Sequence, residues 1–131
     1  MTTTTLGAAN IERTIAENDI VLVDFWAAWC GPCRQFAPVY EQASAANPDV
    51  VFGKVDTEAE AALAGAAQIT SIPTLMAFKG GQLVFSQPGA LPAPALAQVI
   101  EAVRALESDQ DEQTGPTTAS TTAASTTPRS A

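Results

Sequence analysis

The 131-residue sequence contains no histidine, only two cysteines and only six basic residues. Structural zinc sites use four cysteine or histidine ligands, so a zinc site would have to be shared between two chains. The basic residues are scattered along the chain, the net charge is −8, and a nucleic-acid-binding surface needs a basic stripe. We therefore expect no nucleic-acid partner, and anionic membrane surfaces are disfavoured for the same reason.

Long apolar runs are also missing, and no stretch approaches the length of a membrane span. The first ten residues, MTTTTLGAAN, have neither the basic nor the apolar region of a secretory signal. These features predict a cytoplasmic protein without a membrane partner. In a reducing cytosol, two cysteines are more often catalytic or metal-binding than a structural bridge.

The composition changes sharply near Ser108. Residues 108–131 contain no Leu, Ile, Val, Phe or Tyr, so they cannot bury enough apolar surface to offset the entropy of ordering the chain. We predict a disordered Ser/Thr/Pro/Ala-rich tail there, with a sugar-bearing stalk as the compositional alternative. The folded domain is then residues 1–107.

Apolar periodicity within this domain alternates between strand and helix patterns. Residues 20–27, IVLVDFWA, are apolar on both alternating faces, which is typical of a central strand covered on both sides. Lys79-Gly80-Gly81 predicts a hairpin turn, and Pro38 should kink the helix that contains it. We expect the other strands at 50–56, 74–78 and 82–85, and helices at 8–17, 31–46, 58–66 and 92–106. This order predicts an α/β fold with a mixed sheet between helices.

The two cysteines, Cys30 and Cys33, lie in the stretch WAAWCGPCRQF between a predicted strand and a predicted helix. A structural disulfide between them would close a very short loop and constrain the unfolded chain little. A reactive pair is favoured instead, because both residues fall on one face of a helix that begins near Pro32. Cys30 would lie at the helix N-terminus, where the dipole favours the thiolate. We expect Cys33 to be more shielded and to react second.

Asp24 is the one acidic residue in the apolar strand 20–27, in phase with Ile20, Leu22 and Trp26. Burial of a carboxylate is costly and should raise its pKa towards neutrality. An ion pair with Lys54 on the neighbouring strand would give the acid a structural role. A proton donor or acceptor near the thiols would give it a catalytic role.

The blocks VDFWAAWCGPC at 23–33, SIPTLMAFKGG at 71–81 and PGA at 88–90 together resemble the thioredoxin family, and the match covers about residues 5–107. The resemblance implies the thioredoxin fold, with four to five strands flanked by four helices. It also implies that the chain binds no cofactor, because its redox group is a reversible Cys30–Cys33 disulfide. The expected partners are disulfide-containing client proteins and an NADPH-dependent flavin thioredoxin reductase, and the expected state is a monomer.

The resemblance also assigns roles to individual residues. Cys30 matches the nucleophile and Cys33 the resolving thiol, while Asp24 matches an acid that assists proton transfer at Cys33, with Lys54 near it. Base rates favour a trans Ile72–Pro73 bond, so its cis form is implied by the resemblance alone. The residues that match the substrate groove are Trp29, Gly31, Pro32, Ile72, Pro73 and Gly89.

The expected function is therefore that of a thiol–disulfide oxidoreductase that reduces protein disulfides, in electron transport and cell redox homeostasis. Two other functions stay open from the sequence. The fold could serve as a binding or chaperone module in which redox turnover is secondary, although such a module has no need of a buried Asp24. An oxidising, exported variant is the third possibility, and the missing signal segment weighs against it.

Overall fold

The computed structural model describes residues 3–106, so the tail predicted for 108–131 lies outside the described residues. Within this range the chain forms one five-stranded sheet and four helices, which confirms the predicted fold class. The strands are β1 (Thr3–Thr5), β2 (Ile20–Trp26), β3 (Val51–Asp56), β4 (Thr74–Lys79) and β5 (Gln82–Pro88). The helices are α1 (Ile11–Glu17), α2 (Gly31–Ala46), α3 (Ala61–Ala66) and α4 (Ala93–Ala105).

The sheet is mixed, with the strand order β1-β3-β2-β4-β5. Both β1 and β2 pair with β3 in parallel, while β4 is antiparallel to β2 and to β5. The strand β2 is central, as its two apolar faces predict, and six of its seven residues are buried. It therefore places Asp24 in the middle of the sheet.

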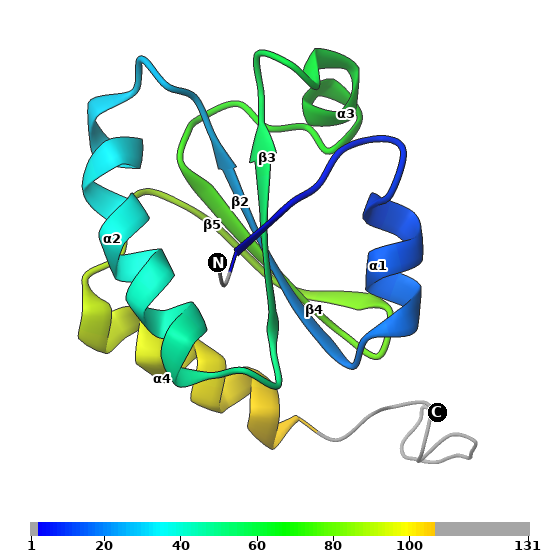
Figure 1. The fold of residues 1–131 in the computed structure, drawn as a ribbon, viewed down its shortest axis with the longest axis vertical. Coiled ribbons are helices and arrows are strands. Elements are labelled where there is room, and N and C mark those ends of the chain that lie inside the picture. Colours follow the sequence, from blue (N-terminus) through cyan, green and yellow to red (C-terminus); the bar gives the residue numbers. More distant parts are fainter. Residues whose placement is uncertain (1–2, 107–131) are drawn as a thin grey trace, which may run out of the picture.

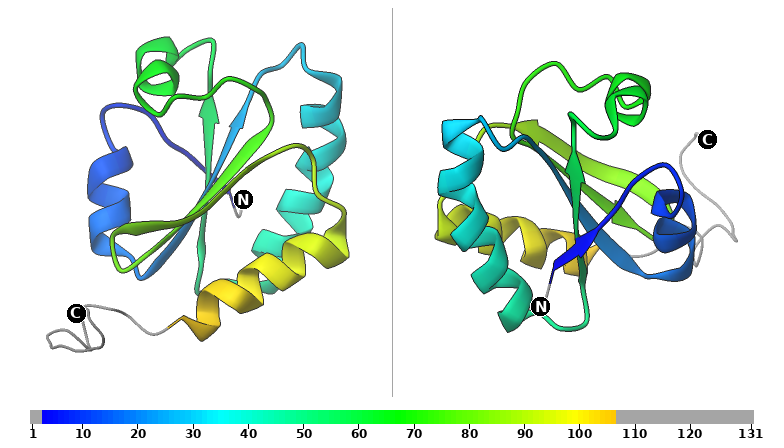
Figure 2. Two further views of the ribbon diagram at one scale, coloured as in Figure 1. Left: turned by 180° about the vertical axis from the view of Figure 1, so that it is seen from behind. Right: turned by 45° about the horizontal axis from the view of Figure 1, so that its top comes forward.

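Helices cover both faces of the sheet (Figure 1). The rotated views in Figure 2 keep α1 and α2 on opposite sides of it. Two apolar clusters fill the layers between helices and sheet, and burial of their side chains is the main driving force for folding. The cluster under α2 and α4 includes Leu22, Phe36, Tyr40, Phe52, Leu75, Leu96 and Ile100, and the cluster under α1 and α3 includes Leu6, Ile11, Val21, Val23, Phe25 and Val55.

Several element boundaries differ from the predicted ones. The helix α3 begins at Ala61 rather than at residue 58, because Asp56 accepts the Glu58 backbone N–H at 2.9 Å and holds a turn there. The helix α2, by contrast, has its predicted bounds, Gly31 to Ala46, and contains Pro38. The β4–β5 hairpin forms as predicted, and both Gly80 and Gly81 have the positive φ that its tight turn requires.

The direction of the strands brings distant loops to one edge of the sheet. The parallel strands β2 and β3 end at this edge, and β5, which runs in the same direction as β2, also ends there. The antiparallel strand β4 begins at the same edge. The segments that follow β2, β3 and β5 and the segment that precedes β4 therefore meet at the N-terminus of α2 (Figure 1). In residues 3–106 no helix has the length and apolar character needed to cross a membrane.

Candidate active site

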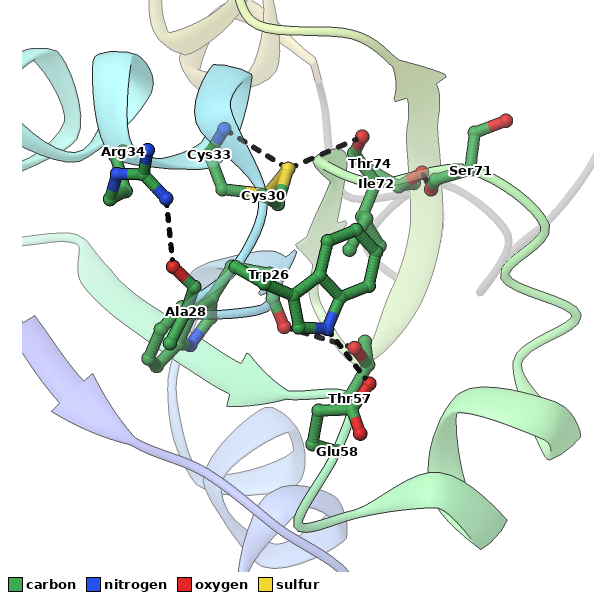
Figure 3. Close-up of a disulfide and its surroundings, with 11 residues drawn as sticks. Trp26, Ala28, Cys30, Cys33, Arg34, Thr57, Glu58, Ser71, Ile72 and Thr74 are labelled. Carbon is green, nitrogen blue, oxygen red and sulfur yellow. Dashed lines mark hydrogen bonds between the residues drawn. A yellow bond between two sulfur atoms is a disulfide. The ribbon is translucent and has the colours of Figure 1, made fainter.

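Cys30 and Cys33 are joined by a disulfide at the N-terminus of α2, with their Cα atoms 5.2 Å apart (Figure 3). Cys30 is the N-cap residue of the helix, and its Sγ accepts the backbone N–H of Cys33 at 3.2 Å. An N-cap side chain satisfies a backbone donor that has no partner inside the helix. This geometry confirms that the two sulfurs can pair and places the Cys30 sulfur where the helix favours negative charge.

The shielding of the two cysteines differs from the prediction. Cys30 is 4% exposed and Cys33 is 3% exposed, so the disulfide form makes almost no distinction between them. The difference lies in their neighbours instead. The Cys30 sulfur lies 3.8 Å from the Ile72 carbonyl oxygen, at the end of the loop that precedes β4.

The Ile72–Pro73 peptide bond is cis, as the resemblance implied and against the base rate. Pro73 is buried and its carbonyl accepts the backbone N–H of Gly89 at 2.7 Å. Gly89 has a φ of +104°, in the region that favours glycine, and a Cβ at this position would meet no atom within 4 Å. A larger side chain at position 89 would therefore extend into the open space beside Pro73.

Three residues predicted for the groove are direct sequence neighbours of the two cysteines. Trp29 is 66% exposed, Pro32 is exposed and Gly31 is half-buried. A large exposed aromatic ring next to a buried disulfide provides apolar surface for a partner protein. The Trp29 indole is held in place, because its Nε1 donates a hydrogen bond to Glu58 Oε2 at 3.1 Å.

The sequence reasoning did not identify Glu58 or Arg34 as part of this site. Glu58 follows the end of β3, and carboxyl ends of neighbouring parallel strands are the usual place for functional side chains, so a signal was available. Arg34 Nη1 donates a hydrogen bond at 3.0 Å to the Ala28 carbonyl oxygen and so links the helix to the loop before Cys30 (Figure 3). Nothing in the local sequence pattern points to this second contact.

Asp24 is buried in the middle of β2, with 1% of its surface exposed. Neither carboxylate oxygen has a hydrogen-bond partner within residues 3–106. Burial raises the pKa of Asp24 from its ordinary 3.8 to about 7, although the charge of Lys54 acts in the opposite direction. The carboxyl group can therefore take up or release a proton near neutral pH.

Lys54 lies directly opposite Asp24 in the pairing of β2 with β3. In the described part of the chain, however, no ion pair joins the two side chains. The Lys54 ammonium instead lies 4.9 Å from the centroid of the Trp26 ring. The ion pair considered from the sequence is thus absent between the described side chains, and Lys54 acts on Asp24 only from a distance.

Tyr40, on α2, is a further titratable side chain near Asp24. It is fully buried, and its hydroxyl donates a hydrogen bond to the Gly53 carbonyl oxygen at 2.8 Å. Burial, followed by the nearby Asp24 charge, raises the pKa of Tyr40 well above 10.0. Tyr40 therefore stays protonated and serves as a fixed wall of the site.

The chemistry available here is narrow. No group of three or more metal-ligating side chains occurs within residues 3–106. Two sulfurs that pair one helical turn apart can exchange two electrons as a dithiol–disulfide couple, and the buried acid can exchange a proton. The fold and the site thus define a thiol–disulfide oxidoreductase.

Comparisons with known proteins give the same class. The Thioredoxin family model matches residues 2–102. A putative thioredoxin 2 of Streptomyces coelicolor is 56% identical over 108 residues, covering 82% of this chain and 81% of that protein. A thioredoxin of Alicyclobacillus acidocaldarius is 43% identical over 104 residues, covering 76% of this chain and 99% of that protein.

Solved structures agree with the sequence comparisons. A thioredoxin of Plasmodium falciparum has a TM-score of 0.71 at 38% identity, covering 76% of this chain and 98% of its own. A mutant thioredoxin of Halobacterium salinarum has a TM-score of 0.74 at 32% identity, covering 81% of this chain and 94% of its own. The chain belongs to the thioredoxin family, and its activity is that of a protein-disulfide reductase with the Cys30–Cys33 pair as its redox group.

Proposed function

We propose that Cys30 is the nucleophile and Cys33 the resolving thiol in the reduction of client protein disulfides. The Cys30 thiolate attacks one sulfur of a client disulfide, forms a mixed disulfide and releases the other client sulfur as a thiolate, which takes up a proton. The observation that carries this assignment is the hydrogen bond from the Cys33 backbone N–H to the Cys30 sulfur at 3.2 Å, because such a donor favours negative charge on Cys30.

Asp24 serves the second half of the reaction. Its carboxylate accepts the Cys33 proton, and the Cys33 thiolate then attacks the Cys30 sulfur. The second client thiolate leaves, so the client gains two electrons and the Cys30–Cys33 disulfide forms. The proposal is supported by the burial of Asp24 and by its pKa of about 7, which suits proton exchange at neutral pH.

The client binds as an extended segment across the rim of the disulfide. Its backbone pairs with the backbone of Ile72, as in other cases of strand addition. The exposed ring of Trp29 supports this arrangement, as does the open surface beside Gly89. The groove residues in this proposal are Trp29, Gly31, Pro32, Ile72, the cis residue Pro73, and Gly89.

The oxidised protein is returned to the dithiol by an NADPH-dependent flavin thioredoxin reductase, and it acts as a cytoplasmic monomer in electron transport and redox homeostasis. This part of the proposal is supported by membership of the family. It also agrees with the cysteine content, because the two cysteines of a protein in a reducing compartment are more often catalytic than a structural bridge.

Reduction of insulin by dithiothreitol tests the assignment, since each cysteine variant serves as the control for the other. Wild type should accelerate the turbidity of released insulin chains, and Cys30→Ser should lose this effect. Cys33→Ser should accumulate a mixed disulfide that mass spectrometry detects on Cys30. Asp24→Asn should retain the first attack and slow the release of the client.

Equal rates for wild type and Cys30→Ser would contradict the nucleophile assignment. A mixed disulfide that accumulates in Cys30→Ser rather than in Cys33→Ser would reverse the two roles. Unchanged release by Asp24→Asn in single-turnover kinetics would leave Asp24 with a structural role only.

A further inference from the structure

The Lys54 ammonium has two possible neighbours on β2. Asp24 lies directly opposite Lys54 in the strand pairing, and Trp26 follows Asp24 by two residues. Side chains two residues apart on a strand point to the same face of the sheet, so the ring and the carboxylate are both within reach of Lys54. The ammonium lies over the ring, 4.9 Å from its centroid.

The carboxylate, by contrast, has no partner. Both Asp24 oxygens lack a hydrogen bond within residues 3–106, although Asp24 is 1% exposed. An ammonium that moves onto a buried carboxylate must give up its water, and this desolvation opposes the ion pair. Trp26 and Lys54 are only half-buried, so the ammonium keeps part of its hydration while it contacts the ring.

We propose that Trp26 is a positioning residue, whose ring holds the Lys54 ammonium beside the Asp24 carboxyl group and so keeps that group unpaired and free to exchange a proton. This inference rests on the proposed function, in which Asp24 accepts the Cys33 proton. A direct ion pair would stabilise the ionised carboxylate and weaken it as a base. Trp26 also packs against the small cluster of Ala27, Cys30 and Cys33, but in this proposal its ring acts on the acid through the lysine.

The other groups that face Asp24 are fixed. From α2 this is Tyr40, on whose pKa the Asp24 charge acts and whose hydroxyl is bonded to the Gly53 carbonyl oxygen. The Cys30–Cys33 disulfide at the start of α2 does not titrate. The β4 partner is Leu75, which is apolar. The buried residues of α4 are also apolar, namely Leu96, Ile100 and Val103. Among these neighbours, Lys54 is the charge that can change its distance to Asp24.

Titration of Asp24 in the disulfide form tests the proposal, because the cysteines then contribute no protons of their own. The side-chain carboxyl carbon is followed by NMR in protein labelled with ¹³C-aspartate, and Asp24→Asn identifies the signal. In Trp26→Leu the lysine is released towards the carboxylate, so the Asp24 midpoint should fall by roughly half a pH unit. Trp26→Phe keeps a ring with a weaker cation–π attraction for Lys54, so the Asp24 midpoint should fall by less.

The same ring substitutions in a Lys54→Met background separate the lysine from other effects of the ring. If Trp26 acts through Lys54, the fall should vanish when the ammonium is gone. An equal fall in both backgrounds would show that the ring acts by changing solvation, and it would overturn the proposal. No fall in the presence of Lys54 would overturn it as well.

Lys79→Met is the matched control, since it removes one positive charge that is paired with Asp19 at the other end of the sheet. It should leave the Asp24 midpoint in place. The rate of client release by the same variants against pH tests the proposed function separately. If the Asp24 midpoint shifts but the pH dependence of client release does not, the role of Asp24 in catalysis is contradicted. The placement of Lys54 by Trp26 would still stand.

Discussion

At the scale of single residues, Asp24 shows that a buried acid lowers the stability of the fold when it ionises. Its carboxyl group is buried without a hydrogen bond within the described residues, and its pKa is about 7 rather than 3.8. The native state therefore binds this proton more tightly than the unfolded state does. As a consequence, the free energy of unfolding should fall as the pH rises from about 4 to about 7.

We expect this effect to be measurable in Asp24→Asn. Ionisation of Asp24 should lower the free energy of unfolding by about 4 kcal/mol at most, since a pKa difference of one unit corresponds to about 1.4 kcal/mol. Urea unfolding of the disulfide form is measured at about pH 4.5 and about pH 8.5. The free energy of unfolding of Asp24→Asn should rise relative to that of wild type at the higher pH. Asp19→Asn supplies the control, because it makes the same change of side chain at an exposed position. A gap for Asp24→Asn that stays constant with pH would contradict the assignment.

The individual site residues differ in how far the sequence could reveal them. Cys30, Cys33 and Asp24 were found because their spacing and their phase in an apolar strand are local properties. The contacts of Trp29 with Glu58 and of Arg34 with the Ala28 carbonyl were missed, since each depends on how side chains meet in space. The contact of Lys54 with Trp26 rather than Asp24 is decided by hydration, which a strand pattern does not encode.

At the scale of elements, the end of α3 carries a residue that its backbone disfavours. The backbone N–H groups of Gln68 and Ile69 bond to the carbonyls of Gly65 and Ala64, which is the Schellman pattern of a helix C-terminus. Gln68 occupies the left-handed position with a φ of +61°. Glycine is the usual residue there because a Cβ is unfavourable in that conformation.

Gln68→Gly should therefore stabilise the protein by up to about 1 kcal/mol, after the greater entropy of glycine in the unfolded chain is subtracted. Chemical denaturation of wild type and variant measures the change. Gln68→Ala keeps the Cβ and removes only the exposed side chain, so it should bring no comparable gain. Equal stability of the glycine and alanine variants would contradict this account.

The boundaries of the elements show where local sequence stops being sufficient. The sequence pattern located β2 and α2 within about one residue, because the apolar periodicity that defines each element lies within its own residues. The strand β5 extends to Pro88, beyond the predicted residue 85, because its last residues pair with Thr74 and Leu75 on β4. The strand β1 comprises only Thr3–Thr5 and exists through its pairing with β3.

At the scale of the whole molecule, the two layers of side chains meet tightly across Gly53 in β3. On one face, Leu6 lies where a Cβ of residue 53 would be, with its Cγ 2.9 Å from that position. On the other, the Tyr40 hydroxyl bonds to the Gly53 carbonyl oxygen at 2.8 Å. The first strand is thus anchored by the fit of Leu6 over a residue without a side chain.

Gly53→Ala should lower the free energy of unfolding by about 1–3 kcal/mol, because the added methyl group displaces Leu6 from a filled space. Gly65→Ala provides the contrast, since a Cβ there meets no atom within 4 Å and α3 gains a better helix former. In thermal unfolding, the melting temperature should fall for Gly53→Ala and rise for Gly65→Ala. A neutral Gly53→Ala would mean that Leu6 is not held as the packing implies.

The sequence by itself determined that two cysteines one helical turn apart follow a central strand with a buried acid, because spacing and periodicity are properties of neighbouring residues. Only the tertiary structure decided that Ile72 lies beside the Cys30 sulfur, that Gly89 bonds to Pro73 and that Glu58 bonds to Trp29. They are separated along the chain and meet because β2, β3 and β5 end, and β4 begins, at one edge of the sheet. The tertiary structure also decided that Asp24 stays unpaired. The Lys54 ammonium lies over Trp26 because it would lose more of its hydration next to the buried carboxylate.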